Sequence, residues 1–294
     1  MVRAGQLRAL GPARRSAGLS LLEWLVASFI AWSLIAAALV QTVSARRSQR
    51  LQAAQALMIE DAQIAIELLR ADLMMAGYGR PLRLRSSPGG PASWQTALDA
   101  APLWACDHGF ASLPSNAQPV CAAAPAAGSL SSSAVEIAYE ADGYSTVLGS
   151  DGHPTDCLGN SLDASTAADG SRVYIAYNRW QVSTGTRSEL RCGGRSSSGL
   201  QPVVDNVERL VLSWGLPVDA GEGTALRFLS AAQVSDFRQV RAVRFCLLLR
   251  SSDPVLGPDD VRSYTDCAGK ALTSDDGRLR RTFGSTVALR NWSR

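Results

Sequence analysis

The hydrophobic and polar positions divide the chain into an apolar helix, an amphipathic continuation and a region of alternating residues. Residues 19–43 are apolar apart from one charge, Glu23. As a helix this segment is roughly 37 Å long, which is enough to cross a hydrocarbon core of about 30 Å. It is also longer than the apolar region of a secretory signal peptide, roughly 7–15 residues. The pattern therefore predicts one membrane-spanning helix near the N-terminus.

The helical pattern continues beyond the apolar segment. No proline or glycine occurs between Gly18 and Gly77, and Gly77, Gly79 and Pro81 together predict a helix end. Apolar residues recur at spacings of three and four, at Leu51, Ala54, Met58, Ala62, Ala65 and Leu69. We expect one helix over 19–76, roughly 87 Å long, which spans the membrane to about residue 43. A separate transmembrane helix followed by a coiled-coil stalk is the alternative.

The remaining residues predict a sheet domain behind an irregular connection. Residues 77–134 are rich in Pro, Gly, Ser and Ala and predict an irregular connecting region, with one short helix near 94–101. From residue 135 onward, strand-like alternation recurs without helical patterns between the runs. The runs are centred on Ile137, Ile175, Leu212, Phe245 and Phe283–Leu289, and Asp142-Gly143 predicts a hairpin turn into a strand over 144–148. The fold class is therefore α+β: a long N-terminal helix packed on an antiparallel β-sheet domain over 135–294.

Charge argues against nucleic acid as a partner. The formal net charge is +3, from 29 basic and 26 acidic residues, and residues 1–18 contribute four arginines without an acid. The rest of the chain is therefore close to neutral, whereas binding to phosphates needs a surplus of cations. Arg278, Arg280 and Arg281 form a local basic cluster, which we expect to be a solvated strand end or a contact for an acidic partner subunit. DNA is not expected as a partner.

The residues before and inside the apolar helix follow a demanding pattern. A basic leader precedes Gly18, and Glu23 is the only acid before Glu60. An ionised carboxylate in hydrocarbon costs several kcal/mol, so Glu23 needs a partner or a position at the membrane interface. The pair Arg14-Arg15 also suggests a twin-arginine signal, which no other feature supports. The hexapeptide Gly18-Leu19-Ser20-Leu21-Leu22-Glu23 resembles the cleavage motif of type IV pilins and type II secretion pseudopilins.

This resemblance implies processing and a role for the buried acid. In that class, prepilin peptidase cuts after the glycine and methylates the new amine, here between Gly18 and Leu19. Leu19 departs from the phenylalanine that the family usually has first. Glu23 becomes the fifth mature residue and pairs with the α-amino group of a neighbouring subunit. Because a buried carboxylate without its partner is costly, this pair would enforce axial register in a filament.

Three C-terminal segments narrow the resemblance. Residues 202–208, 242–251 and 279–291 resemble the C-terminal half of PilW-type minor pilins. This implies a minor pilin that primes type IV pilus assembly and twitching motility, with other minor pilins, the major pilin and a tip adhesin as partners. It also implies a single-pass inner-membrane protein with a cytoplasmic N-terminus and a periplasmic domain, found at the pilus tip after assembly. A J-type pseudopilin of type II secretion and a non-pilin membrane-anchored periplasmic protein remain alternatives.

Six cysteines follow the membrane segment, an even number that indicates disulfides in a periplasmic domain. Six cysteines allow 15 pairings, and their order in the sequence does not decide among them. We favour sequential neighbours, which would each contribute about 3–4 kcal/mol. These pairs are Cys106–Cys121, Cys157–Cys192 and Cys246–Cys267. A zinc site is not expected because no CxxC pair exists, and we interpret Cys106-Asp107-His108 as incidental.

Motifs for catalysis and cofactors are missing from the sequence. It contains no GxSxG, Walker loop, Rossmann fingerprint or HExxH. Aspartate-rich turns such as Asp142-Gly143, Asp151-Gly152 and Asp275-Asp276-Gly277 lack the EF-hand pattern, and turns use these residues for their own geometry. We therefore expect neither an enzyme nor a cofactor or metal site. The sequence leaves open what residues 80–134 do.

Overall fold

A computed structural model describes residues 18, 20–85, 92–98, 101–115, 117–126, 131–183, 187–197, 199–218, 225–258 and 260–291. The chain divides between Arg50 and Leu51 into two compact units. The expected leader, apart from Gly18, and the expected first mature residue, Leu19, lie outside the described residues.

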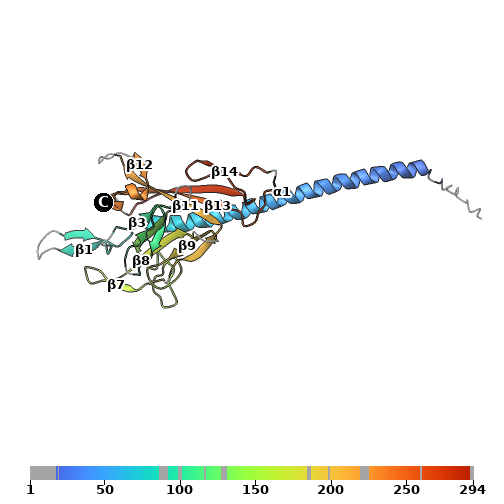
Figure 1. Cartoon of the computed structure of the whole chain (residues 1–294). Coiled ribbons are helices and arrows are strands. Elements are labelled where there is room, and N and C mark those ends of the chain that lie inside the picture. Colours follow the sequence, from blue (N-terminus) through green and yellow to red (C-terminus); the bar gives the residue numbers. More distant parts are fainter. Residues whose placement is uncertain are drawn as a thin grey trace, which may run out of the picture. The chain divides into compact units, whose positions relative to one another are not determined.

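The helix α1 is continuous from Leu21 to Met75, so the structure has one long helix and no separate stalk (Figure 1). Its N-terminal half is exposed and is long and apolar enough to cross a membrane. Its C-terminal half buries one stripe of side chains, Met58, Ala62, Ala65, Leu69 and Leu73. The chain leaves the helix at Gly77, whose φ of 75° lies in the left-handed region that glycine adopts without strain.

Two antiparallel sheets form the C-terminal unit. The first has the order β10-β9-β8-β6-β3, with β7 paired to β8, and the second has the order β12-β11-β13-β16. Three two-stranded ribbons, β1–β2, β4–β5 and β14–β15, accompany them. The bounds are β1 Leu82–Arg85, β2 Ala92–Gln95, β3 Leu103–Cys106, β4 Phe110–Ser112, β5 Val120–Cys121, β6 Ala134–Glu140, β7 Ala164–Thr166, β8 Arg172–Val182, β9 Glu189–Gly193, β10 Gln201–Asp205, β11 Val207–Pro217, β12 Leu226–Leu229, β13 Ala242–Arg250, β14 Ser263–Thr265, β15 Ala271–Thr273 and β16 Arg280–Ala288, with 3-10 turns η1 Ala231–Gln233 and η2 Phe237–Gln239. The predicted α+β class, a long helix on antiparallel sheet, is confirmed.

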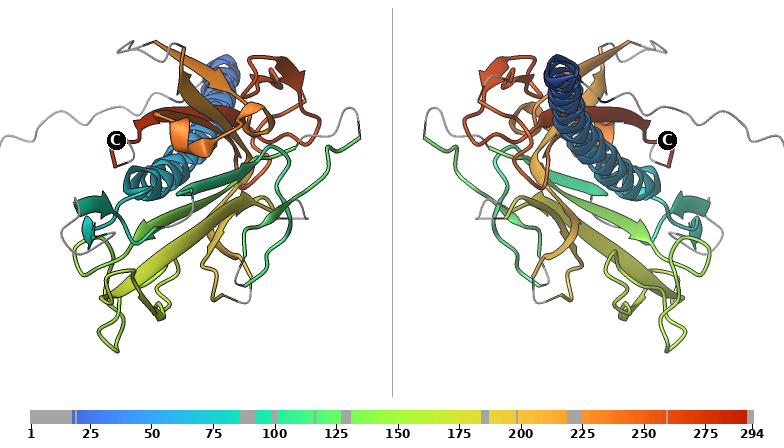
Figure 2. Two further views of the ribbon diagram at one scale, coloured as in Figure 1. Left: turned by 90° about the vertical axis from the view of Figure 1, so that its left-hand side faces the viewer. Right: turned by 90° about the vertical axis from the view of Figure 1, so that its right-hand side faces the viewer.

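The core lies where the helix meets both sheets. Figure 2 shows the C-terminal half of α1 between the green strands of the first sheet and the orange and red strands of the second. Its buried stripe joins one cluster with side chains of both sheets, including Trp180 of the first sheet and Trp214 and Phe245 of the second. Ser133 N–H donates to Leu210 O at 2.7 Å and ties the two sheets directly.

Two local expectations differ from the structure. Residues 77–134 contain five short strands, and β3 pairs with β6 at the edge of the first sheet. The strand β2 occupies part of the stretch where a short helix was expected. Residues 144–148 form no strand, because the Asp142 carboxylate accepts the N–H groups of Tyr144 and Ser145 and the turn continues.

Candidate assembly site

The first described residues carry the N-terminal motif. Gly18 is exposed, and a Cβ added there would meet open space. Ser20 N–H donates to Glu23 Oε2 at 2.9 Å, and Glu23 N–H donates to Ser20 Oγ at 3.2 Å. These reciprocal bonds form a capping box at the start of α1. Glu23 therefore caps its own helix, a role that the Ser-x-x-Glu spacing signals and that the sequence reasoning missed.

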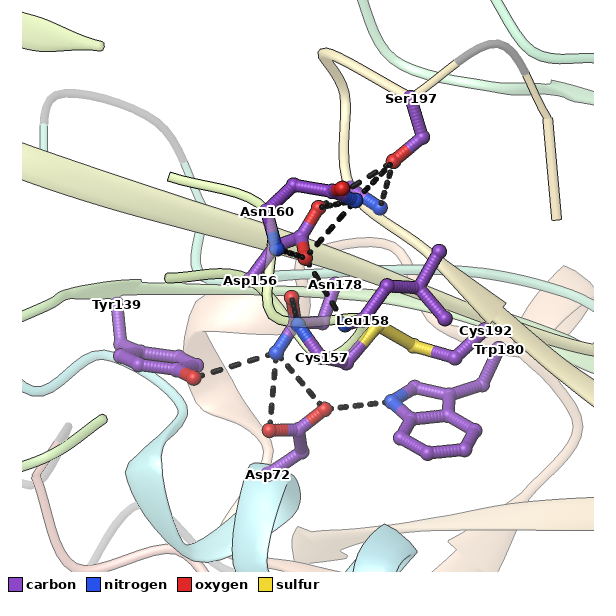
Figure 3. The surroundings of a disulfide bond; sticks show 11 residues. Asp72, Tyr139, Asp156, Cys157, Leu158, Asn160, Asn178, Trp180, Cys192 and Ser197 are labelled. Carbon is purple, nitrogen blue, oxygen red and sulfur yellow. Dashed lines mark hydrogen bonds between the residues drawn. A yellow bond between two sulfur atoms is a disulfide. The ribbon is translucent and has the colours of Figure 1, made fainter. Parts of the chain in front are cut away.

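A carboxylate on the docked half of the helix faces the first sheet. Asp72 lies three residues after Leu69 and hence on the side of α1 that packs against the strands. Trp180 Nε1 donates to Asp72 Oδ2 at 2.6 Å, and Asn178 Nδ2 lies 3.0 Å from both Asp72 oxygens (Figure 3). Asn178 Nδ2 is also 3.2 Å from the Tyr139 hydroxyl. The polar cluster thus fixes the helix against β6 and β8.

Burial dominates the ionisation of this carboxyl. It raises the pKa of Asp72 from 3.8 to about 6, although hydrogen bonds from Trp180 and Asn178 act in the opposite direction. The Tyr139 pKa is also raised, by burial first and by the neighbouring Asp72 second. The sequence signal for this site was an acid on an apolar helical stripe, which the reasoning from periodicity overlooked.

The same cluster continues to a disulfide. Asn178 Oδ1 accepts the Cys157 N–H at 3.0 Å, and Cys157 is bonded to Cys192 of β9 (Figure 3). Asp156, the residue before, accepts the N–H groups of Leu158 and Asn160 through its carboxylate. One connected set of bonds therefore joins the helix, two strands and a loop.

All three disulfides join sequential neighbours, as favoured from the sequence. The Cα–Cα distances are 5.3 Å for Cys106–Cys121, 6.4 Å for Cys157–Cys192 and 5.7 Å for Cys246–Cys267. No free cysteine occurs among the residues that the structure describes.

Two of these disulfides are built on a repeated turn. Residues 155–160 read Thr-Asp-Cys-Leu-Gly-Asn, and residues 265–270 read Thr-Asp-Cys-Ala-Gly-Lys. In each, the aspartate carboxylate accepts the N–H groups two and four residues later, and the glycine has φ near 80° (81° and 78°). Each turn lies in the connection between two paired strands, β6 and β8 or β13 and β16. The repeat was visible in the sequence and shows one disulfide-linked turn used once in each sheet.

A buried ion cluster covers the other face of the first sheet. Glu136 of β6 accepts Arg179 Nε at 2.7 Å and Arg195 Nη2 at 2.6 Å. Arg179 is 2% exposed and also donates to Pro114 O and Ala117 O, both at 2.8 Å. Because buried charges are tolerated only when they are paired and hydrogen-bonded, this cluster fixes residues 114–117 over the sheet.

The other candidate residues have structural contacts. Asp107 does not meet a metal, but accepts the N–H groups of Ala231 and Ala232 at the start of η1. Among the described residues, no group of three or more His, Cys, Asp or Glu side chains is placed to hold a metal ion. In the basic cluster, Arg280 pairs with Glu208 and Asp276, and its guanidinium lowers the Asp276 pKa. Arg281 beside it is exposed.

Comparison with known proteins agrees with the C-terminal resemblance. Residues 177–291 match the family model of Type IV Pilus-assembly protein W, and this stretch contains all three segments that carried the predicted resemblance. The similarity to PilW-type pilus-assembly proteins is thereby confirmed for the region from within β8 to just beyond β16.

One solved structure is similar in description and in extent. The type IV-like pilin TTHA1219 from Thermus thermophilus has 15% sequence identity and a TM-score of 0.38, over 80% of this chain and 97% of its own. No curated protein matches the chain.

Proposed function

We propose that this chain is a minor pilin that prepilin peptidase processes between Gly18 and Leu19 and that helps to prime type IV pilus assembly. One observation carries the proposal: a pilin-type cleavage motif begins a 55-residue helix in the same chain whose C-terminal sheet matches a pilus-assembly family. The apolar half of α1 would anchor the protein in the inner membrane before assembly, with the disulfide-bonded unit in the periplasm. Its role would be structural and not enzymatic.

The partners follow from the same proposal. Other minor pilins, the major pilin and a tip adhesin would contact the chain in a tip complex. In the filament, the apolar helix halves would pack together, and Glu23 would need a cation because no water replaces its hydration there. The methylated α-amino group of a neighbouring subunit would supply that charge.

The capping box allows a sharp test of Glu23. A deletion strain would be complemented with wild type, Glu23→Ala or Ser20→Ala, and sheared surface pili would be quantified. Ser20→Ala removes one capping bond but keeps the carboxylate, so it controls for weakened helix capping, about 1 kcal/mol. We expect wild type and Ser20→Ala to restore pili and Glu23→Ala to fail.

Other outcomes have definite meanings. Equal loss in both variants would contradict a register role and assign Glu23 to capping alone. Normal piliation in the deletion strain, together with lost export of folded periplasmic enzymes, would favour a J-type pseudopilin of type II secretion. Mass spectrometry of the mature N-terminus tests processing separately, and an uncut Gly18–Leu19 bond would indicate a non-pilin membrane-anchored protein.

A further inference from the structure

The connection between β6 and β8 presents apolar side chains to solvent. Tyr144 is 102% exposed, Val147 81% and Leu148 49%. These three residues, here named the apolar tip, are neighbours in one loop of the C-terminal unit. Clusters of exposed aromatic and aliphatic residues mark protein contacts, and tyrosine is prominent among the residues that dominate binding energy.

The backbone of the apolar tip is held in place before any partner arrives. Asp142 Oδ1 accepts the N–H groups of Tyr144 and Ser145 at 2.9 and 2.8 Å. Thr155 Oγ1 donates to Val147 O at 2.7 Å, and Thr155 directly precedes the Asp-Cys turn that is bonded to β9. A loop fixed in this way loses little conformational entropy when it binds.

Acidic residues surround the apolar tip. Residues 141–171 contain no lysine or arginine, and four aspartates in this stretch lie at least partly in solvent: Asp142, Asp151, Asp163 and Asp169. Burial opposes ionisation of Asp142, but the N–H groups that it accepts lower its pKa overall, and hydrogen bonds also lower the pKa of Asp151 and Asp169. Arg80 and Arg172 border the stretch, and Arg80 is paired with Glu140. The loop is therefore an acidic pole with an apolar centre.

One end of the second sheet has the opposite charge. Five arginines converge there, from β12, η2, β13 and the residue that follows Leu289: Arg227, Arg238, Arg241, Arg244 and Arg290. The pairing of Gly215 with both Phe228 and Ala242, and the bond from Leu289 N–H to Arg241 O, bring these segments together. The Arg244 guanidinium lies 4.0 Å from the centroid of the Phe228 ring. This end is a basic pole that contains an aromatic platform.

The two poles lie on opposite sides of the C-terminal unit. In Figure 2 the yellow-green loops that follow β6 are at the bottom and the orange strand β12 is at the top. We infer that the acidic pole of one copy docks on the basic pole of a second copy, with Tyr144 against the platform formed by Phe228 and Arg244. The ring would find both apolar contact and a cation, and the aspartates would face arginines.

Unlike surfaces on opposite sides produce a particular kind of assembly. A head-to-tail contact leaves one pole of each end copy free, so association continues beyond a dimer. This inference extends the proposed function, because subunits of a filament meet their neighbours through unlike surfaces. Association in solution and piliation are separate readouts, so the two proposals can fail independently.

The test uses the full-length protein in detergent micelles and analytical ultracentrifugation. We expect the mass of wild type to rise with concentration past the dimer, and to fall when NaCl is raised from about 50 mM to about 500 mM. Tyr144→Ala disables the acidic pole and Arg244→Glu the basic pole, so each variant alone should remain monomeric. We expect Tyr144→Ala to weaken association roughly 30-fold, the effect of removing a hot-spot residue.

Mixing the two variants gives the decisive result. Tyr144→Ala keeps an intact basic pole and Arg244→Glu an intact acidic pole, so an equimolar mixture should form a dimer and stop there. Such a dimer also proves that both variants are folded. Val261→Ala and Arg281→Glu alter exposed residues outside both poles and should associate like wild type. A monomeric wild type, a wild type that stops at a dimer, or a mixture that stays monomeric would overturn the inference.

Discussion

The carboxyl of Asp72 gives the sharpest test of how the helix is held to the first sheet. Its pKa is raised to about 6 by burial, from 3.8. The native state therefore holds a proton that the unfolded state releases between these two values. The stabilisation by the neutral carboxyl is fully present below about pH 3.8 and is lost as pH rises through about 6.

The magnitude follows from the shift. A difference of about two pKa units corresponds to about 3 kcal/mol at neutral pH and above. At about pH 4.5 the unfolded state is already mostly ionised, and about 1 kcal/mol of this difference has developed. Between about pH 4.5 and pH 7.5, wild type should therefore lose about 2 kcal/mol that a variant without the carboxyl does not lose.

The assay compares Asp72→Asn with wild type at both pH values. Urea unfolding of the full-length protein in detergent, followed by tryptophan fluorescence, gives the free energy of unfolding, because Trp180 and Trp214 are buried. The readout is the change with pH of the difference between the proteins, since asparagine also alters the bond to Trp180. Glu67→Gln, on the exposed side of the same helix, should show no such change. A difference that is independent of pH, or that grows in favour of wild type at high pH, would refute the reasoning.

Two further perturbations test the clusters around the first sheet. Glu136→Gln leaves Arg179 buried without its full counter-charge and weakens the hold on Arg195, so we expect a loss of roughly 3–5 kcal/mol in urea unfolding; a loss below about 1 kcal/mol would show that the cluster contributes little. The double substitution Cys157→Ser and Cys192→Ser opens a link across a sequence separation of 35 residues, and the chain-entropy relation gives a loss of about 4 kcal/mol. Thermal melting would measure the second loss, and an unchanged midpoint would contradict it.

Local signals in the sequence were sufficient for the helix and for most of the strands. The apolar run up to Val43 and the stripe through Leu69 are set by residue spacing, and Gly77 ends the helix through its own backbone conformation. Strands β8, β11, β13 and β16 contain the runs of alternating residues that predicted them. These features depend on neighbours within a few residues, so a sequence pattern reports them directly.

Other features depend on residues that are distant in the chain, and only the tertiary structure decided them. The strand β3 is stabilised by pairing with β6, so its composition alone gave no strand signal. Asp72 meets Trp180 and Asn178 more than 100 residues later, at separations of 108 and 106. The N-terminal motif and the pattern of α1 were thus determined by the sequence itself. The buried charge cluster, the sheet edges and the two oppositely charged poles arise from packing, because their interactions exist only after distant segments meet.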